Sequence, residues 1–224
     1  MDVKEILRRV DHTLLAQGAT WDEIRQICDD GMKYGCASVC IPQSYVNRAS
    51  RYIADNWREK GSWLPVCTVI GFPNGYSPTE IKCAEAENSV LDGAGEVDMV
   101  VNLGWVKEGR YDLVEEEINE IKESCHGRLL KVIIETCLLT EEEKIRLCEA
   151  VSRSDADYIK TSTGFAGGGA TREDVALMVK HTKGKLVKAS GGIADLKDAE
   201  DFLALGASRL GTSRIVKAVQ AQEK

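Results

Sequence analysis

The chain has 224 residues, of which 43% are apolar and 29% charged, with a formal net charge of −7. This composition excludes a disordered chain, and the length fits a single domain over residues 1–224, because α/β barrels of this size are often undivided. The acidic balance argues against a nucleic-acid-binding protein, and the absence of a signal region or of any run near the ~18 apolar residues of a membrane span predicts a cytoplasmic protein without membrane contact.

Short β-branched runs recur along the chain. Their spacing is roughly thirty residues, about what one strand, one helix and two turns require. They are Val10–Leu15, which is the weakest, Val39–Ile41, Val66–Ile70, Val97–Val101, Leu130–Ile134, Tyr158–Thr161, Leu186–Ala189 and Ser208–Gly211. We interpret these runs as eight strands.

Helix-start signals lie between the predicted strands. Ser77-Pro78-Thr79-Glu80 offers an N-cap serine followed by proline at the first helical position. Capping-box spacing recurs at Thr20…Glu23, Thr140…Glu143 and Thr171…Asp174. Strands that alternate with helices favour a parallel sheet, and eight such units close a (β/α)8 TIM barrel, here with a short N-terminal helix. An open, doubly wound α/β sheet is the alternative.

The eight cysteines do not have the spacing of a metal site. No C-x-x-C pair occurs and the chain has only three histidines. Most of the cysteines lie within apolar patterns, as Cys40 and Cys67 do, which is typical of buried reduced thiols. We therefore predict no metal.

Four predicted strands carry an ionisable residue among apolar neighbours: Asp98, Lys131, Lys160 and Lys188. A buried unpaired charge is costly, so it shifts its pKa or finds a partner. Lys131 begins its strand and could simply reach solvent at the bottom of the barrel. Asp98 could be a salt-bridge partner or a proton carrier.

Lys160 and Lys188 each close a strand and are followed by small polar residues. Both are expected at the C-terminal face of the barrel, where active sites are built. Two ammonium groups held close repel each other, which lowers the pKa of at least one and supplies the neutral amine that Schiff-base chemistry needs.

The loops after the last strands suit a phosphate group. Gly191-Gly192 lets backbone N–H groups approach an anion, and Gly211-Thr212-Ser213 follows the last strand and opens the final helix. Barrel enzymes often bind phosphate in the loops after strands seven and eight. A second glycine cluster, Gly167–Gly169, lies on the same face.

At these residues the sequence closely resembles the deoxyribose-phosphate aldolase family over nearly its whole length. The matching segments are residues 11–15, 66–73, 95–100, 130–136, 158–165, 187–192 and 211–213. The resemblance implies a class I aldolase that reversibly cleaves 2-deoxy-D-ribose 5-phosphate to D-glyceraldehyde 3-phosphate and acetaldehyde through a lysine Schiff base. It implies no metal and no organic cofactor; a homodimer is the assembly we consider.

The resemblance also assigns roles. Lys160 matches the Schiff-base lysine, Lys188 the lysine that perturbs it, and Asp98 the acidic member of a proton relay. Positions expected to hold substrate or phosphate are Lys131, Thr163, Gly164, Gly191, Gly192 and Ser213.

One position departs from the family pattern. Many members have a second serine after the position of Ser213, where this chain has Arg214, which could bind phosphate or point into solvent. Two other functions stay open: another Schiff-base barrel aldolase or transaldolase, and a non-catalytic barrel that binds a phosphate ligand.

Overall fold

The predicted strands close into a parallel barrel in a computed structural model of the protein, which describes residues 1–223. Each strand pairs with the next one along the chain, and the last pairs with the first. The strands are β1 (Val10–Thr13), β2 (Ser38–Ile41), β3 (Val66–Ile70), β4 (Glu96–Val100), β5 (Leu129–Ile133), β6 (Tyr158–Lys160), β7 (Leu186–Ser190) and β8 (Arg209–Thr212). The predicted TIM barrel is confirmed, and the open-sheet alternative is wrong.

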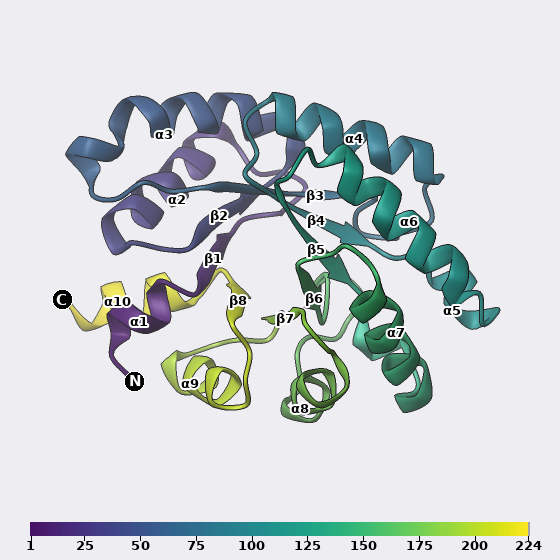
Figure 1. The fold of residues 1–224 in the computed structure, drawn as a ribbon. Coiled ribbons are helices and arrows are strands. Elements are labelled where there is room, and N and C mark those ends of the chain that lie inside the picture. The colour runs from purple at the N-terminus through teal and green to yellow at the C-terminus, as the bar shows by residue number, and fades with distance from the viewer. Residues whose placement is uncertain (224) are drawn as a thin grey trace.

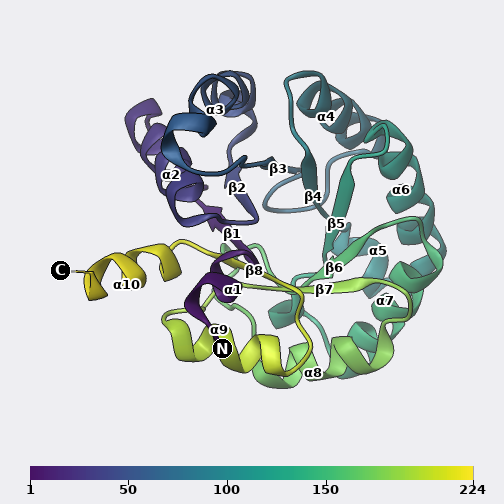
Figure 2. The same cartoon turned by 60° about the vertical axis from the view of Figure 1, so that its left-hand side comes forward.

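Helices surround the strands on the outside of the barrel (Figure 1, Figure 2). They are α1 (Val3–Leu7), α2 (Trp21–Tyr34), α3 (Val46–Lys60), α4 (Thr79–Leu91), α5 (Leu103–Lys107), α6 (Tyr111–Ser124), α7 (Glu141–Arg153), α8 (Arg172–His181), α9 (Leu196–Ala204) and α10 (Ile215–Gln222), with 3-10 turns η1 (Gln43–Tyr45) and η2 (Thr136–Leu138). The expected short N-terminal helix is α1, which packs beside α9 and α10. Across residues 1–223, none of these helices combines the length and apolarity needed to cross a membrane.

Local hydrogen bonds confirm most of the predicted helix starts. Thr140 caps α7, since its hydroxyl accepts from the N–H of Glu143 at 3.3 Å while the Glu143 carboxylate accepts from the Thr140 N–H at 2.8 Å. The Thr171 hydroxyl accepts from the N–H of Asp174 at 3.0 Å, but the Asp174 carboxylate binds Lys144 and does not complete a capping box. The predicted cap at Ser77 is wrong, because Pro78 has the extended N-cap conformation and α4 begins at Thr79.

Alternation along the strands divides the buried residues into two sets. Val39 and Ile41 of β2 face outward into the main apolar core between strands and helices. Cys40 lies between them and faces the barrel interior, where it packs with Cys67 and Val69 of β3. Successive side chains of a strand point to opposite faces, so the residues that share the interior can be read from this period of two. Several of the other interior positions carry charges.

Candidate active site

Asp98 of β4 lies at the centre of the barrel and binds three lysines. Its Oδ2 atom lies 2.7 Å from the Nζ of Lys160 and 2.8 Å from the Nζ of Lys188, while its Oδ1 lies 2.8 Å from the Nζ of Lys131. The register of the parallel strands brings these four side chains together. Asp98 of β4 is paired with Lys131 of β5, and Lys160 of β6 is paired with Lys188 of β7. The structure therefore joins all four of the ionisable strand residues singled out in the sequence.

Two further carboxylates and an arginine extend this cluster below Asp98. Glu96 lies 2.7 Å from the Nζ of Lys131, and Asp11 forms an ion pair with Lys188. Arg209 of β8 contacts both carboxylates, at 2.6 Å from Asp11 and 3.1 Å from Glu96. Lys131 is completely buried within these pairs, so the interpretation in which it reaches solvent at the barrel's bottom is wrong.

The cluster shifts the pKa values of its members in opposite directions. Burial alone would raise the pKa of Asp98, but the ammonium groups of Lys131, Lys160 and Lys188 hold it well below its usual range. Burial would likewise lower the pKa of Lys188, but Asp11 and Asp98 raise it well above its usual range. The pKa of Lys131 is raised in the same way. Repulsion between Lys160 and Lys188 was expected to lower the pKa of at least one of them. The pKa of Lys188 is not lowered, because the Asp98 carboxylate lies between the two ammonium groups.

Lys160 differs from the other two lysines in its surroundings. It forms one ion pair, to Asp98, and is the only one of the three with any exposed surface, at 2%. The ionised cluster, taken as Lys131, Lys160, Lys188 and Arg209 against Asp11, Glu96 and Asp98, holds one more cation than anions. Of the three lysines, Lys160 is the one that solvent reaches, and it belongs to a cluster with an excess of positive charge.

A cavity of about 450 Å³ lies at the C-terminal ends of β1, β6, β7 and β8. It brings together five of the predicted substrate-binding residues: Thr163, Gly164, Gly191, Gly192 and Ser213. The sixth, Lys131, does not line it, and its predicted contact with substrate stays a prediction. Lys160 lies three residues before Thr163, so its strand leads directly into the wall of the cavity.

Backbone donors line this cavity without acceptors of their own. Within residues 1–223, the N–H groups of Gly164, Gly192 and Ser213 form no hydrogen bond to another protein group. Gly191 has φ of 81°, and a Cβ atom there would lie 3.1 Å from the Cα of Gly169, so a side chain at this position would be both strained and crowded. The wall is therefore built for close approach of a ligand to the backbone.

Arg214 is the one charged residue among those that line this cavity. It has no acidic partner within the part of the chain that the structure describes, and it occupies the N-cap position of α10. The predicted start of this helix at Thr212-Ser213 is thus two residues too early. The Thr212 hydroxyl instead accepts from the Arg214 N–H at 3.0 Å. An unpaired guanidinium and a helix N-terminus together favour an anionic ligand group.

Comparison with known proteins agrees with this arrangement. Residues 6–208 match the model of the family described as DeoC/LacD family aldolase. The chain belongs to the DeoC/LacD aldolase family.

Similar proteins of this aldolase family cover the whole chain. A deoxyribose-phosphate aldolase of Streptococcus agalactiae is 57% identical over 224 residues, which are 100% of this chain and 97% of the relative. One from Streptococcus pyogenes is 58% identical over 221 residues, 98% of this chain and 96% of the relative. The structure of the tetrameric deoxyribose phosphate aldolase from Aeropyrum pernix superposes with a TM-score of 0.86 at 31% identity, covering 100% of this chain and 93% of that one.

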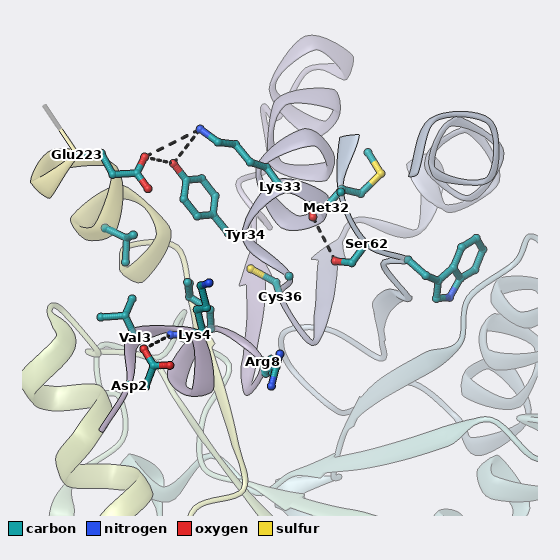
Figure 3. A pocket seen from close by; sticks show the side chains of 15 residues that line it. Asp2, Val3, Lys4, Arg8, Met32, Lys33, Tyr34, Cys36, Ser62 and Glu223 are labelled. Carbon is teal, nitrogen blue, oxygen red and sulfur yellow. Dashed lines mark hydrogen bonds and ion pairs between the residues drawn. The ribbon is translucent and has the colours of Figure 1, made fainter. Parts of the chain in front are cut away.

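A larger cavity of about 750 Å³ lies at the opposite end of this aldolase barrel (Figure 3). It is formed by α1, the end of α2, the segment between α3 and β3, and α10. Lys33 and Tyr34 meet Glu223 at its edge, where the Tyr34 hydroxyl donates to the Glu223 carboxylate at 2.7 Å (Figure 3). It holds none of the candidate site residues, so the smaller cavity at the strand ends is the better candidate for the aldolase site.

Two groups of buried donors in the barrel have the spacing of metal ligands. One combines Cys40, Cys67 and Asp98, and the other combines Asp11, Cys67 and Glu96. In both groups the carboxylates already have lysine or arginine partners, which occupy the place of a cation. All eight cysteines are free thiols, and six of them are buried, as predicted.

Four residues of the site were not singled out from the sequence: Asp11, Glu96, Glu135 and Arg209. Asp11 and Arg209 are charged residues within strands, the same signal that identified Asp98. Asp11, however, lies in the weakest predicted strand, and Arg209 lies near the start of its strand. Glu135, whose carboxylate accepts from the N–H and hydroxyl of Thr163 in the cavity wall, gives no such signal, because its contacts depend on a loop conformation.

Proposed function

We propose that the protein is a class I aldolase that reversibly cleaves 2-deoxy-D-ribose 5-phosphate to D-glyceraldehyde 3-phosphate and acetaldehyde. The observation that carries this proposal is the barrel-interior cluster, in which Asp98 joins Lys160 to two other lysines and Lys160 alone keeps exposed surface. The names and full-length coverage of the relatives support the substrate. We propose the whole of residues 1–224 as one barrel domain that acts without a metal or organic cofactor.

In the cleavage direction, the neutral amine of Lys160 attacks the C1 aldehyde of the open-chain sugar, and loss of water gives an iminium. Removal of the proton from the C3 hydroxyl breaks the C2–C3 bond and releases glyceraldehyde 3-phosphate. The bonding electrons move into an enamine, with the iminium nitrogen as electron sink. Protonation at C2 and hydrolysis then release acetaldehyde and restore the lysine.

Asp98 and Lys188 are the proposed carriers of the protons in these steps. In the resting state Lys160 is paired with Asp98, so its proton must leave before attack. Lys160 and Lys188 both donate to the same carboxylate oxygen of Asp98, which gives a short path for proton exchange between the two lysines. Lys131 holds the other oxygen at 2.8 Å and so fixes the orientation of the carboxylate.

The proposed binding site for the sugar phosphate is the cavity at the strand ends. Thr163 and Gly164 are proposed to bind the part of the sugar near Lys160. Gly191, Gly192 and Ser213 are proposed to bind the phosphate through backbone N–H groups and the serine hydroxyl. These loops follow β6, β7 and β8, neighbouring strands of the barrel, so their donors can converge on one anion.

A coupled assay tests the proposal. Purified protein should release acetaldehyde and glyceraldehyde 3-phosphate from 2-deoxyribose 5-phosphate in equal amounts, and chelation should leave the rate unchanged. A panel of donor substrates separates this activity from that of a transaldolase, which would transfer a longer ketose fragment. Absence of cleavage with intact ligand binding would favour the non-catalytic barrel.

Replacement of Ser213 by alanine should weaken phosphate binding selectively. A hydrogen bond to a charged group contributes about 1.5–3 kcal/mol, so the KM for 2-deoxyribose 5-phosphate should rise by at least about tenfold. Cleavage of unphosphorylated 2-deoxyribose should change little. Steady-state kinetics with both substrates provide the measurement, and equal losses for the two sugars would contradict a phosphate contact.

Arg214→Ala should show the same selectivity with a stronger dependence on salt. The guanidinium contributes both charge and hydrogen bonds, so the ratio of kcat/KM between phosphorylated and unphosphorylated sugar should fall by about tenfold or more at low ionic strength. Lys217→Ala is the matched control, since Lys217 is exposed on the first turn of the same helix and does not line the cavity. If both variants change this ratio of kcat/KM values equally, the arginine acts only through its contribution to the overall electrostatic potential and not through contact with the phosphate.

A homodimer in the cytoplasm completes the proposal. Free cysteines suit a reducing compartment, and large apolar side chains such as Tyr76 and Leu91 are more than 70% exposed on the single chain. Analytical ultracentrifugation would establish the assembly, for which the tetrameric relative provides a competing outcome.

A further inference from the structure

Glu135 is a buried carboxylate beside the proposed active site that none of these roles uses. It follows β5, is 2% exposed and forms no salt bridge within residues 1–223. Apart from a long thiol contact from Cys137, at 4.0 Å, its carboxylate is satisfied by one residue. That residue is Thr163, which donates its N–H, at 3.2 and 3.3 Å from the two oxygens, and its hydroxyl. Burial of a carboxylate is costly, and here that cost is offset by hydrogen bonds from a single residue in the wall of the cavity.

The backbone of Glu135 is strained and tied to the strand that carries Lys160. Its φ of 54° and ψ of 65° are left-handed, a conformation that residues with a Cβ atom rarely adopt. On either side, the N–H of Ile134 donates to the Lys160 carbonyl at 3.0 Å and the N–H of Thr136 donates to the Thr161 carbonyl at 2.9 Å. Such strain persists where surrounding contacts enforce it, and it is concentrated at functional sites.

This arrangement determines what the Thr163 hydroxyl can offer a ligand. Its single proton is directed to Glu135, and one lone pair accepts the N–H of Phe165 at 3.0 Å. One acceptor position is left and no donor. A ligand group that meets this hydroxyl must therefore donate a hydrogen bond, as a sugar hydroxyl does and an aldehyde oxygen cannot.

We propose that Glu135 is a positioning residue that holds Thr163 as a hydrogen-bond acceptor for a hydroxyl of the sugar phosphate. Glu135 does not line the cavity, so it acts through Thr163 and not by contact with substrate. This role rests on the proposed aldolase function, because it assigns Thr163 to the recognition of a hydroxylated substrate. Acetaldehyde has no hydroxyl and should not sense the interaction.

Kinetics on 2-deoxyribose 5-phosphate test the proposal with four variants: Glu135→Ala, Glu135→Gln, Thr163→Val and the double variant Glu135→Ala/Thr163→Val. Glu135→Ala should lower kcat/KM by about 10- to 100-fold, the range expected when a contact group is misplaced. Glu135→Gln keeps one acceptor oxygen and should recover part of this loss. The double variant should be no worse than Thr163→Val alone, because a residue that acts through another adds nothing once that other is gone.

Trapping of acetaldehyde with borohydride provides the second measurement. Ethylation of Lys160 in Glu135→Ala should stay within about twofold of the unaltered protein, since the step needs no hydroxyl contact. Loss of trapping together with sugar cleavage would indicate a merely structural role and overturn the proposal, as would multiplicative losses in the double variant. If the unaltered protein is not trapped, the proposed function itself has failed.

Glu135→Gly separates the carboxylate from the backbone strain. Glycine adopts the left-handed conformation without penalty, so this variant should fold at least as well as Glu135→Ala in thermal unfolding. It should nevertheless show the same loss of kcat/KM on the sugar phosphate. Full activity in Glu135→Gly would show that the backbone conformation matters and the carboxylate does not, which would overturn the proposal.

Discussion

Treatment with acetaldehyde and borohydride should add a single ethyl group to the protein, and peptide mapping should place it on Lys160. Lys160→Ala should abolish this labelling and lower kcat/KM by roughly 10⁴- to 10⁶-fold, the size of effect seen when a covalent nucleophile is removed. The fold should persist, because Asp98 keeps its ion pairs with Lys131 and Lys188. Intact mass spectrometry and thermal unfolding provide the two measurements.

Lys160→Arg is the matched control for this result. Arginine retains the positive charge beside Asp98, but its guanidinium stays protonated at any pH the protein tolerates and does not form an imine. The arginine variant should therefore be as inactive as the alanine variant, which would separate loss of the nucleophile from loss of the ion pair. Ethylation of Lys188 or Lys131 in the unaltered protein would contradict the assignment.

The barrel was predictable from the sequence because its signals are local. The β-branched runs and the capping threonines each lie within one strand–helix unit, and the units repeat about every thirty residues. All eight strands were predicted. The error at Ser77 has a local cause as well. Proline fixes its own φ and is compatible with both the N-cap and the first helical position, so the pattern alone does not determine where α4 begins.

The charged cluster of the candidate site was predictable only where a charge interrupts a strongly apolar strand. Asp98, Lys160 and Lys188 stand out in this way, but their mutual geometry depends on the register of neighbouring strands. The Asp11–Arg209 pair joins residues 198 apart in the chain and exists because β8 closes on β1. Left-handed backbone at Glu135 has no sequence signature, since glutamate is rare in that conformation.

The same long-range geometry corrects the expected role of Lys188. Direct repulsion between the Lys160 and Lys188 ammonium groups was the simplest prediction, but Asp98 lies between them and the pKa of Lys188 is raised. We therefore propose that Lys188 acts on Lys160 through the charge balance of the whole cluster. Lys188 supplies one of the four cations that together outnumber the three carboxylates.

Lys188→Leu should move the pH at which half of the protein is trapped by acetaldehyde upward by about one unit or more. Removal of this cation leaves Asp11 and Asp98 undercompensated, and a more negative surrounding favours the protonated form of the reacting amine. Activity near neutral pH should fall sharply and recover in part at alkaline pH. The same change breaks fully buried ion pairs, so the free energy of unfolding should decrease by about 3–5 kcal/mol.

Lys188→Arg separates the effect of charge on the midpoint from the transfer of protons. It keeps a cation near Asp11 and Asp98, so the trapping midpoint should stay close to that of the unaltered protein. Turnover of the sugar phosphate should still fall, since arginine does not exchange protons as lysine does. A trapping midpoint that is the same in Lys188→Leu and the unaltered protein would show that burial sets the reactivity of Lys160. The neighbouring charge would then matter only for proton transfer, and the shared oxygen of Asp98 would be its path.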